Sequence, residues 1–142
     1  MKASARNQFT GTVNEVRIGA VNAEVHVGLK GGDIIVASIT KESAETLGIK
    51  IGIEVIAMVK APQIIIVSDF GGYRLSARNQ LKGTVSQVKP GAVNAEIDIE
   101  LSGGEQIAAT VTNDSVDTLG LHKGQAVTAV FKAGAVILAV AS

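Results

Sequence analysis

The chain has 142 residues, of which 46% are hydrophobic, and this composition favours a folded protein over a disordered one. Its 13 basic residues balance 13 acidic ones, and with three Phe, one Tyr and no Trp it lacks the positive charge and stacking surface typical of nucleic-acid-binding proteins. The absence of cysteine excludes disulfides and thiolate metal sites.

The N-terminal segment "MKASARNQFTG" has no apolar core of the kind that a signal peptide needs. No apolar run approaches the ~18–20 residues that span a membrane. We therefore expect a cytoplasmic protein with no membrane and no nucleic-acid partner.

Three strands are predicted first along the chain. Residues 9–18 are rich in β-branched side chains, which favour a strand. Residues 21–29 alternate apolar and polar side chains, the period of a half-buried strand. "KGGD" at 30–33 predicts a hairpin turn because its glycines can adopt positive φ. The apolar run 34–39 then has the length of a third strand.

A short helix and two further strands complete the first half. Thr40 suits the N-cap of a helix and Gly48 its C-terminal stop. Residues 53–60 and 64–67 are again apolar and β-branched, and they predict strands four and five. Five strands with a helix between the third and fourth are typical of an OB-type Greek-key barrel, with a generic small β-barrel as the alternative.

The second half repeats the first. At an offset of 72, residues 4–70 align without a gap with 76–142, and about thirty of the 67 positions are identical, including "GAVNAE" at 19–24 and 91–96. We therefore predict an all-β protein made of two tandem OB-type five-stranded Greek-key barrels, each with one short helix. The expected domains are 1–68 and 75–142, joined by a linker at 69–74. Modules this small are expected to bury surface against each other or against other chains.

Catalytic constellations are missing from the repeat. The two histidines, His26 and His122, align with Asp98 and Lys50, so neither belongs to a shared site. No phosphate-binding loop, HExxH or GxSxG motif occurs. We expect no enzyme.

The polar residues shared by both copies are almost all hydrogen-bond donors, and Glu24/Glu96 is the one acidic exception among them. A fully deprotonated tetrahedral dianion offers only acceptors, so its site needs N–H, O–H and cationic groups. Simpler roles remain open for each residue, such as helix capping by Thr40 or a solvated surface charge at Lys60. The donors are Ser4/Ser76, Arg6/Arg78, Asn7/Asn79, Gln8/Gln80, Thr12/Thr84, Asn22/Asn94, Thr40/Thr112, Ser43/Ser115, Thr46/Thr118 and Lys60/Lys132.

The motifs "SARNxxxGTV", "GAVNAE", "LxGG", "TxxS" and the closing "KA" resemble the molybdate-binding Mop domain of the wider TOBE class. Two such domains in tandem resemble the di-Mop molbindins. The resemblance covers essentially the whole chain. It implies a homotrimer that binds molybdate or tungstate at subunit interfaces, for cytoplasmic molybdenum storage or homeostasis, without an organic cofactor.

The resemblance also implies two kinds of site. The principal site maps to the S-A-R, T-x-x-S and K-A segments, and a second site near the three-fold axis maps to the G-A-V-N turns. Principal-site residues are Ser4, Ala5, Arg6, Thr40, Ser43, Lys60, Ala61, Ser76, Ala77, Arg78, Thr112, Ser115, Lys132 and Ala133. Second-site residues are Gly19, Ala20, Val21, Asn22, Gly91, Ala92, Val93 and Asn94.

A donor-only site would discriminate against phosphate, whose remaining proton would lack an acceptor, but would separate molybdate poorly from tungstate. Two rival functions are a nucleic-acid-binding OB protein and a regulatory TOBE-like module that acts in trans on a transporter or regulator. The balanced charge and scarcity of aromatic residues disfavour the first rival.

Overall fold

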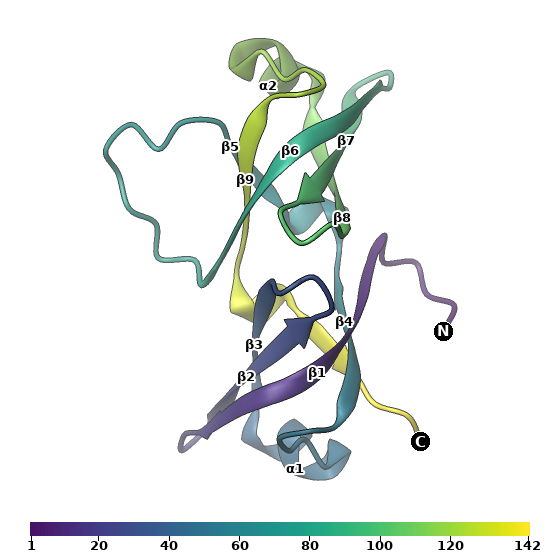
Figure 1. Cartoon of the computed structure of the whole chain (residues 1–142), viewed down its shortest axis with the longest axis vertical. Coiled ribbons are helices and arrows are strands. Elements are labelled where there is room, and N and C mark those ends of the chain that lie inside the picture. The colour runs from purple at the N-terminus through teal and green to yellow at the C-terminus, as the bar shows by residue number, and fades with distance from the viewer.

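The computed structural model describes residues 1–142 and consists of ten strands, two short α-helices and two 3₁₀ turns (Figure 1). Neither α-helix is long and apolar enough to cross a membrane. The first copy contains β1 (Asn7–Ile18), β2 (Asn22–Leu29), β3 (Ile34–Thr40), α1 (Lys41–Leu47), β4 (Glu54–Val59), η1 (Ala61–Gln63) and β5 (Ile65–Val67). The second contains β6 (Asn79–Pro90), β7 (Asn94–Leu101), β8 (Gln106–Thr112), α2 (Asn113–Leu119), β9 (Ala126–Phe131), η2 (Ala133–Ala135) and β10 (Ile137–Ala139).

The strands form two five-stranded antiparallel sheets that exchange their last strands. The orders are β10-β4-β1-β2-β3 and β5-β9-β6-β7-β8, so β5 pairs with β9 of the second copy and β10 with β4 of the first. Figure 1 shows the C-terminal strand lying in the lobe of the first copy. The two curled sheets confirm the expected all-β fold, but neither sheet is built from one sequence copy alone.

The helices begin and end where the sequence predicts. The Thr40 hydroxyl accepts a hydrogen bond from the Ser43 backbone N–H, and Gly48 ends α1 in the left-handed region at φ 67°. Thr112, Ser115 and Gly120 repeat this arrangement around α2. A side-chain oxygen at the N-cap satisfies an otherwise unpaired N–H, and glycine adopts positive φ without steric cost, so local chemistry fixes both ends.

One continuous core of 26 buried residues draws on both copies. In β2 the inward positions Ala23, Val25, Val27 and Leu29 alternate with half-exposed ones, as the period of two predicts. Val21, the first apolar position of the predicted strand 21–29, instead precedes β2 and is 72% exposed. The reason is that it lies in the turn between β1 and β2, where the alternation has not yet begun.

Two buried asparagines join the copies through the backbone. The Asn79 side chain accepts from Val36 N–H and donates to Val36 C=O, both at 2.8 Å. Asn7 makes the equivalent pair with Ala108, at 2.7 and 2.8 Å. Each amide makes the two hydrogen bonds that a neighbouring strand would otherwise make with β3 or β8, the last strand of its sheet. Asn7 and Asn79 are among the shared donors, but within the chain their role is structural.

The two "GG" hairpin turns also contact each other across the copies. Gly103 N–H donates to Asp33 at 3.1 Å, and Gly31 N–H donates to Glu105 at 3.2 Å. The turns approach so closely that a Cβ on Gly103 would lie 2.7 Å from the Gly31 carbonyl oxygen. These acidic residues therefore hold the junction of the copies together.

Candidate functional site

Two related pockets lie where the S-A-R and K-A segments meet. The first has a volume of about 350 Å³. Residue Asn79 at the start of β6 pairs with Phe131 at the end of β9, so the residues just before one strand face those just after the other. The exchanged strand adds residues from the first copy. The lining includes Ser76, Ala77, Arg78, Lys132 and Ala133, with Gln63 and Ile65 from the first copy.

The second pocket repeats this geometry at the other copy, with a volume of about 470 Å³. Asn7 pairs with Val59, which sets the segment before β1 beside the segment after β4. Ser4, Ala5 and Lys60 line it, and the second copy contributes Gly134, Ala135 and Ile137. Arg6 and Ala61 are not part of its lining, and Ala61 is only 2% exposed.

The lysines and arginines of the predicted site differ in their partners. Neither Lys60 nor Lys132 forms an ion pair within the chain. Arg78 instead binds Glu24 of the other copy. The mirror-image contact joins Arg6 to Glu96, with one nitrogen–oxygen distance of 3.1 Å. The lysine charges are therefore free for a ligand, whereas each guanidinium already has a carboxylate partner.

Glu24 remains ionised because its surroundings favour the charged form. A hydrogen bond from His26, supported by the positive charge of Arg78, lowers the pKa of Glu24 from its ordinary value. A carboxylate held in this way keeps the guanidinium oriented and reduces the positive charge that an anion would meet.

The T-x-x-S segments lie away from both pockets. Figure 1 shows α1 and α2 at opposite ends of the molecule, and none of Thr40, Ser43, Thr112 and Ser115 lines either pocket. In each pair the threonine hydroxyl donates to the serine hydroxyl, at 2.8 Å and 2.9 Å. The single chain thus brings S-A-R to K-A but does not bring T-x-x-S to either.

The G-A-V-N turns lie next to the helix starts. Asn22 pairs with Thr40 across β2 and β3, and Lys41 N–H donates to the Val21 carbonyl at 2.8 Å. Val21 and Val93 are each 72% exposed. The G-A-V-N turns of the predicted second site therefore lie beside the T-x-x-S segments of the predicted principal site, and the pairing of β2 with β3 brings them together.

Sequence reasoning missed the pocket residues that come from the opposite copy. Gln63 and Ile65 complete the first pocket, and Gly134, Ala135 and Ile137 complete the second. No signal in the sequence identifies them, because they reach the pockets only through the exchange of β5 and β10.

The TOBE domain family matches residues 3–66 and 75–138, and the chain belongs to this family as a tandem pair. A crystal structure of the cytoplasmic molybdate-binding protein ModG, with molybdate bound, is 52% identical with a TM-score of 0.96, covering 99% of this chain and 100% of that one. Molybdenum transport protein ModE of Herbaspirillum seropedicae is 46% identical over 99% of this chain and 52% of its own length. Molybdenum-pterin-binding protein MopA of Rhodobacter capsulatus is 42% identical over 98% of this chain and 52% of its own. The chain spans about half the length of these two curated relatives.

Proposed function

We propose that the chain binds molybdate, and tungstate with similar affinity, as a storage or homeostasis protein of the cytoplasm without catalytic activity. The observation that carries this proposal is the pair of related pockets in which the Ser-Ala part of S-A-R meets an unpaired lysine, in a chain that matches molybdate-bound ModG over 99% of its length. A tetrahedral dianion would accept hydrogen bonds from the serine hydroxyls and exposed backbone N–H groups and would pair with Lys60 or Lys132.

The geometry further supports a homo-oligomer, which we propose is a trimer with anions at the interfaces between chains. The T-x-x-S hydroxyls are exposed at the far ends of the molecule, so only another chain can bring them to a pocket. Val21 and Val93 offer exposed apolar contacts beside them for such packing. The G-A-V-N turns would then meet near the symmetry axis as the second kind of site.

Equilibrium dialysis of molybdate against the K60A/K132A double variant tests the principal site. We expect at least a tenfold loss of affinity, because a charge-assisted contact in a partly desolvated site contributes on the order of 1.5–3 kcal/mol. K123A, which removes an exposed lysine away from both pockets, is the matched control and should bind as the parent does. Equal binding by the double variant would refute the assignment.

Two competition experiments and one mass measurement complete the test. Tungstate should displace molybdate at comparable concentration, whereas phosphate should not displace it, because its proton would lack an acceptor among donors. Sulfate competing as well as tungstate would contradict the proposed selectivity. Native mass spectrometry with added molybdate should report three chains and the number of bound anions together.

A second candidate role is regulation. Several relatives, such as ModE of Yersinia pestis at 38% identity, are named transcriptional regulators, and this chain spans about half of their length. Pull-down from lysate with and without molybdate would separate the roles, because a regulatory module should gain or lose a partner when the anion binds.

A further inference from the structure

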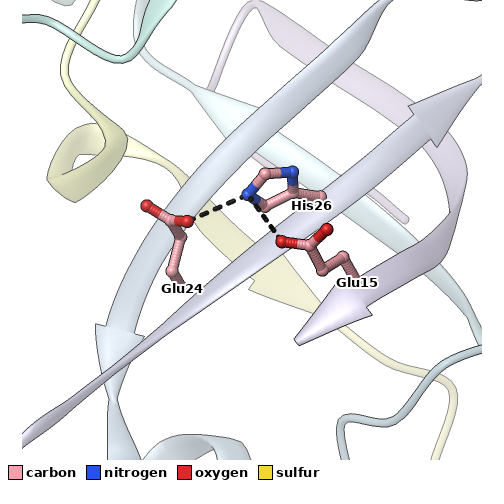
Figure 2. Close-up of side chains that lie close together, drawn as sticks. All are labelled: Glu15, Glu24 and His26. Atoms are coloured by element: carbon pink, nitrogen blue, oxygen red, sulfur yellow. Dashed lines mark hydrogen bonds and ion pairs between the residues drawn. The ribbon is translucent and has the colours of Figure 1, made fainter. Parts of the chain in front are cut away.

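Three ligand-type side chains that line neither pocket meet on the outer face of the β1–β2 pair (Figure 2). His26 Nε2 lies 3.0 Å from Glu24 Oε2 and 3.8 Å from Glu15 Oε2, and all three ligand atoms lie within 4.8 Å of one another. We propose that Glu15, Glu24 and His26 form a binding site for a divalent transition-metal cation. Zn²⁺ is the probe for this site.

A β-bulge creates the cluster. The register between β1 and β2 shifts between Val13 and Glu15, and this shift makes Glu15 the direct cross-strand partner of His26. Glu24 lies two residues before His26, so its side chain points to the same face of the sheet. Bulges commonly redirect a side chain next to a functional site, and here the bulge sets a carboxylate opposite an imidazole.

The donor set and spacing suit such a cation. Imidazole nitrogen and carboxylate oxygen are ordinary Zn²⁺ ligands at about 2.0–2.2 Å, which puts neighbouring donors of a tetrahedral site roughly 3.4 Å apart. The observed 3.0 and 3.8 Å bracket that separation. Three protein ligands would leave a coordination position open to water.

Glu15 Oε2 has only a loosely held partner. The atom itself is buried and forms no hydrogen bond of good geometry, although Arg17 Nε lies 2.5 Å from it as an ion pair. The Glu15 side chain is 40% exposed and the Arg17 side chain 64%, so a bound cation can replace this ion pair and neutralise the same oxygen.

Two arginines surround the cluster without blocking it. Arg17 lies against Glu15 Oε2 and 3.6 Å from Glu24 Oε2, but its side chain is 64% exposed, so this weakly held group can swing into water. Arg78 binds Glu24 through Oε1 and leaves Oε2 for the metal. A hydrogen-bonded partner on the other oxygen is the usual way in which a ligating carboxylate is oriented.

The second copy shows what replaces the site when two of the three side chains differ. The positions equivalent to Glu15 and His26 hold Gln87 and Asp98, on the same bulged backbone. There the Lys89 ammonium lies 3.3 Å from Glu96 and 3.2 Å from Asp98, so a side-chain cation neutralises the two carboxylates. The proposal therefore specifies one metal per chain, in the first copy alone.

Isothermal titration of the full chain with ZnCl₂, in a molybdate-free and phosphate-free buffer at neutral pH, tests the site. We expect about one equivalent per chain and at least a tenfold loss of affinity in E15Q and in H26N. E15Q introduces the residue that the second copy carries at that position, so the fold should tolerate it, and H122N is the matched control for H26N. No Zn²⁺ binding by the parent chain, or unchanged affinity in H26N, would overturn the proposal.

Two further measurements do not depend on those variants. Zn²⁺ should shift the ring resonances of His26 in the NMR spectrum of the parent chain and leave those of His122 in place, and the reverse pattern would refute the site. The triple variant Q87E/K89R/D98H gives the second copy the ligands of the first, so it should bind a second equivalent. Failure to gain it would show that these side chains do not suffice.

Discussion

The substitution N79A tests whether the two copies are held together by their buried asparagines. Asn79 is 1% exposed, and its amide satisfies both the N–H and the C=O of Val36 at 2.8 Å. Alanine would leave both backbone groups buried without partners, at about 1–3 kcal/mol each. The small cavity adds to this cost, so we expect a loss of roughly 3–5 kcal/mol in the free energy of unfolding.

Urea unfolding at fixed protein concentration is the appropriate assay, because the apparent stability of the proposed oligomer would depend on concentration. N14A is the matched control, since Asn14 is exposed and its loss should change stability by less than about 0.5 kcal/mol. N7A should cost as much as N79A, because Asn7 makes the equivalent bonds to Ala108. A loss below about 1 kcal/mol for both buried variants would refute the idea that these amides substitute for strand partners.

The remaining predictions concern the junction and the ion pairs. A G31A variant should lower the melting temperature by several degrees, because its Cβ would collide with the Gly103 carbonyl. G134A is the control, since the new Cβ there meets open space and the melting temperature should not change. Equal melting temperatures for the two variants would contradict this packing. The lowered pKa of Glu24 contributes stability at neutral pH, and this contribution is lost as the pH falls through the lowered pKa. In E24Q the free energy of unfolding, measured by urea titration at a series of pH values, should therefore fall less steeply toward acid pH than in the parent chain. R78A should lower molybdate affinity less than the K60A/K132A double variant does, because the Arg78 guanidinium is already bound to Glu24 in the parent chain. Equilibrium dialysis that shows the larger loss in R78A would assign the arginine the larger role.

Local patterns in the sequence predict most of the individual elements. The alternation in β2, the glycines of the hairpins and the caps of both helices depend on residues close in sequence, and each was found where expected. Strand bounds differ only at the ends, as with β1, which begins at Asn7 rather than residue 9. Backbone geometry and burial on one face of a strand decide these features, and both produce recognisable residue patterns in the sequence.

The roles of the shared polar residues could not be predicted in the same way. Asn7 and Asn79 are donors in both copies, as an anion site would require, yet their partners are backbone groups 101 and 43 residues away in the sequence. The acidic residues Asp33 and Glu105 similarly bind the opposite hairpin. A side chain's partner in another part of the fold leaves no periodic trace in the sequence.

The exchange of β5 and β10 was unpredictable because the two copies are alike. Ile65 pairs with Val130 of β9, but the matching position of β4 is Met58, also apolar and in a strand of the same register. The strand pattern is therefore equally consistent with pairing inside one copy and across two. Only the direction in which η1 and η2 lead the chain decides between them, and each leads into the opposite lobe.

Because strands of the two copies can pair in either way, we make a last prediction about the first copy alone, residues 1–74. Its β4 would lack the partner that β10 supplies, and its β5 would lack β9. Two such fragments can satisfy each other, because β5 of one can pair with β4 of the next as β5 now pairs with β9, so we expect exchanged dimers or multiples of them. Light scattering after size exclusion measures this mass directly. A folded monomer would show that η1 can turn the chain back onto its own sheet, and the pockets would then not require two copies.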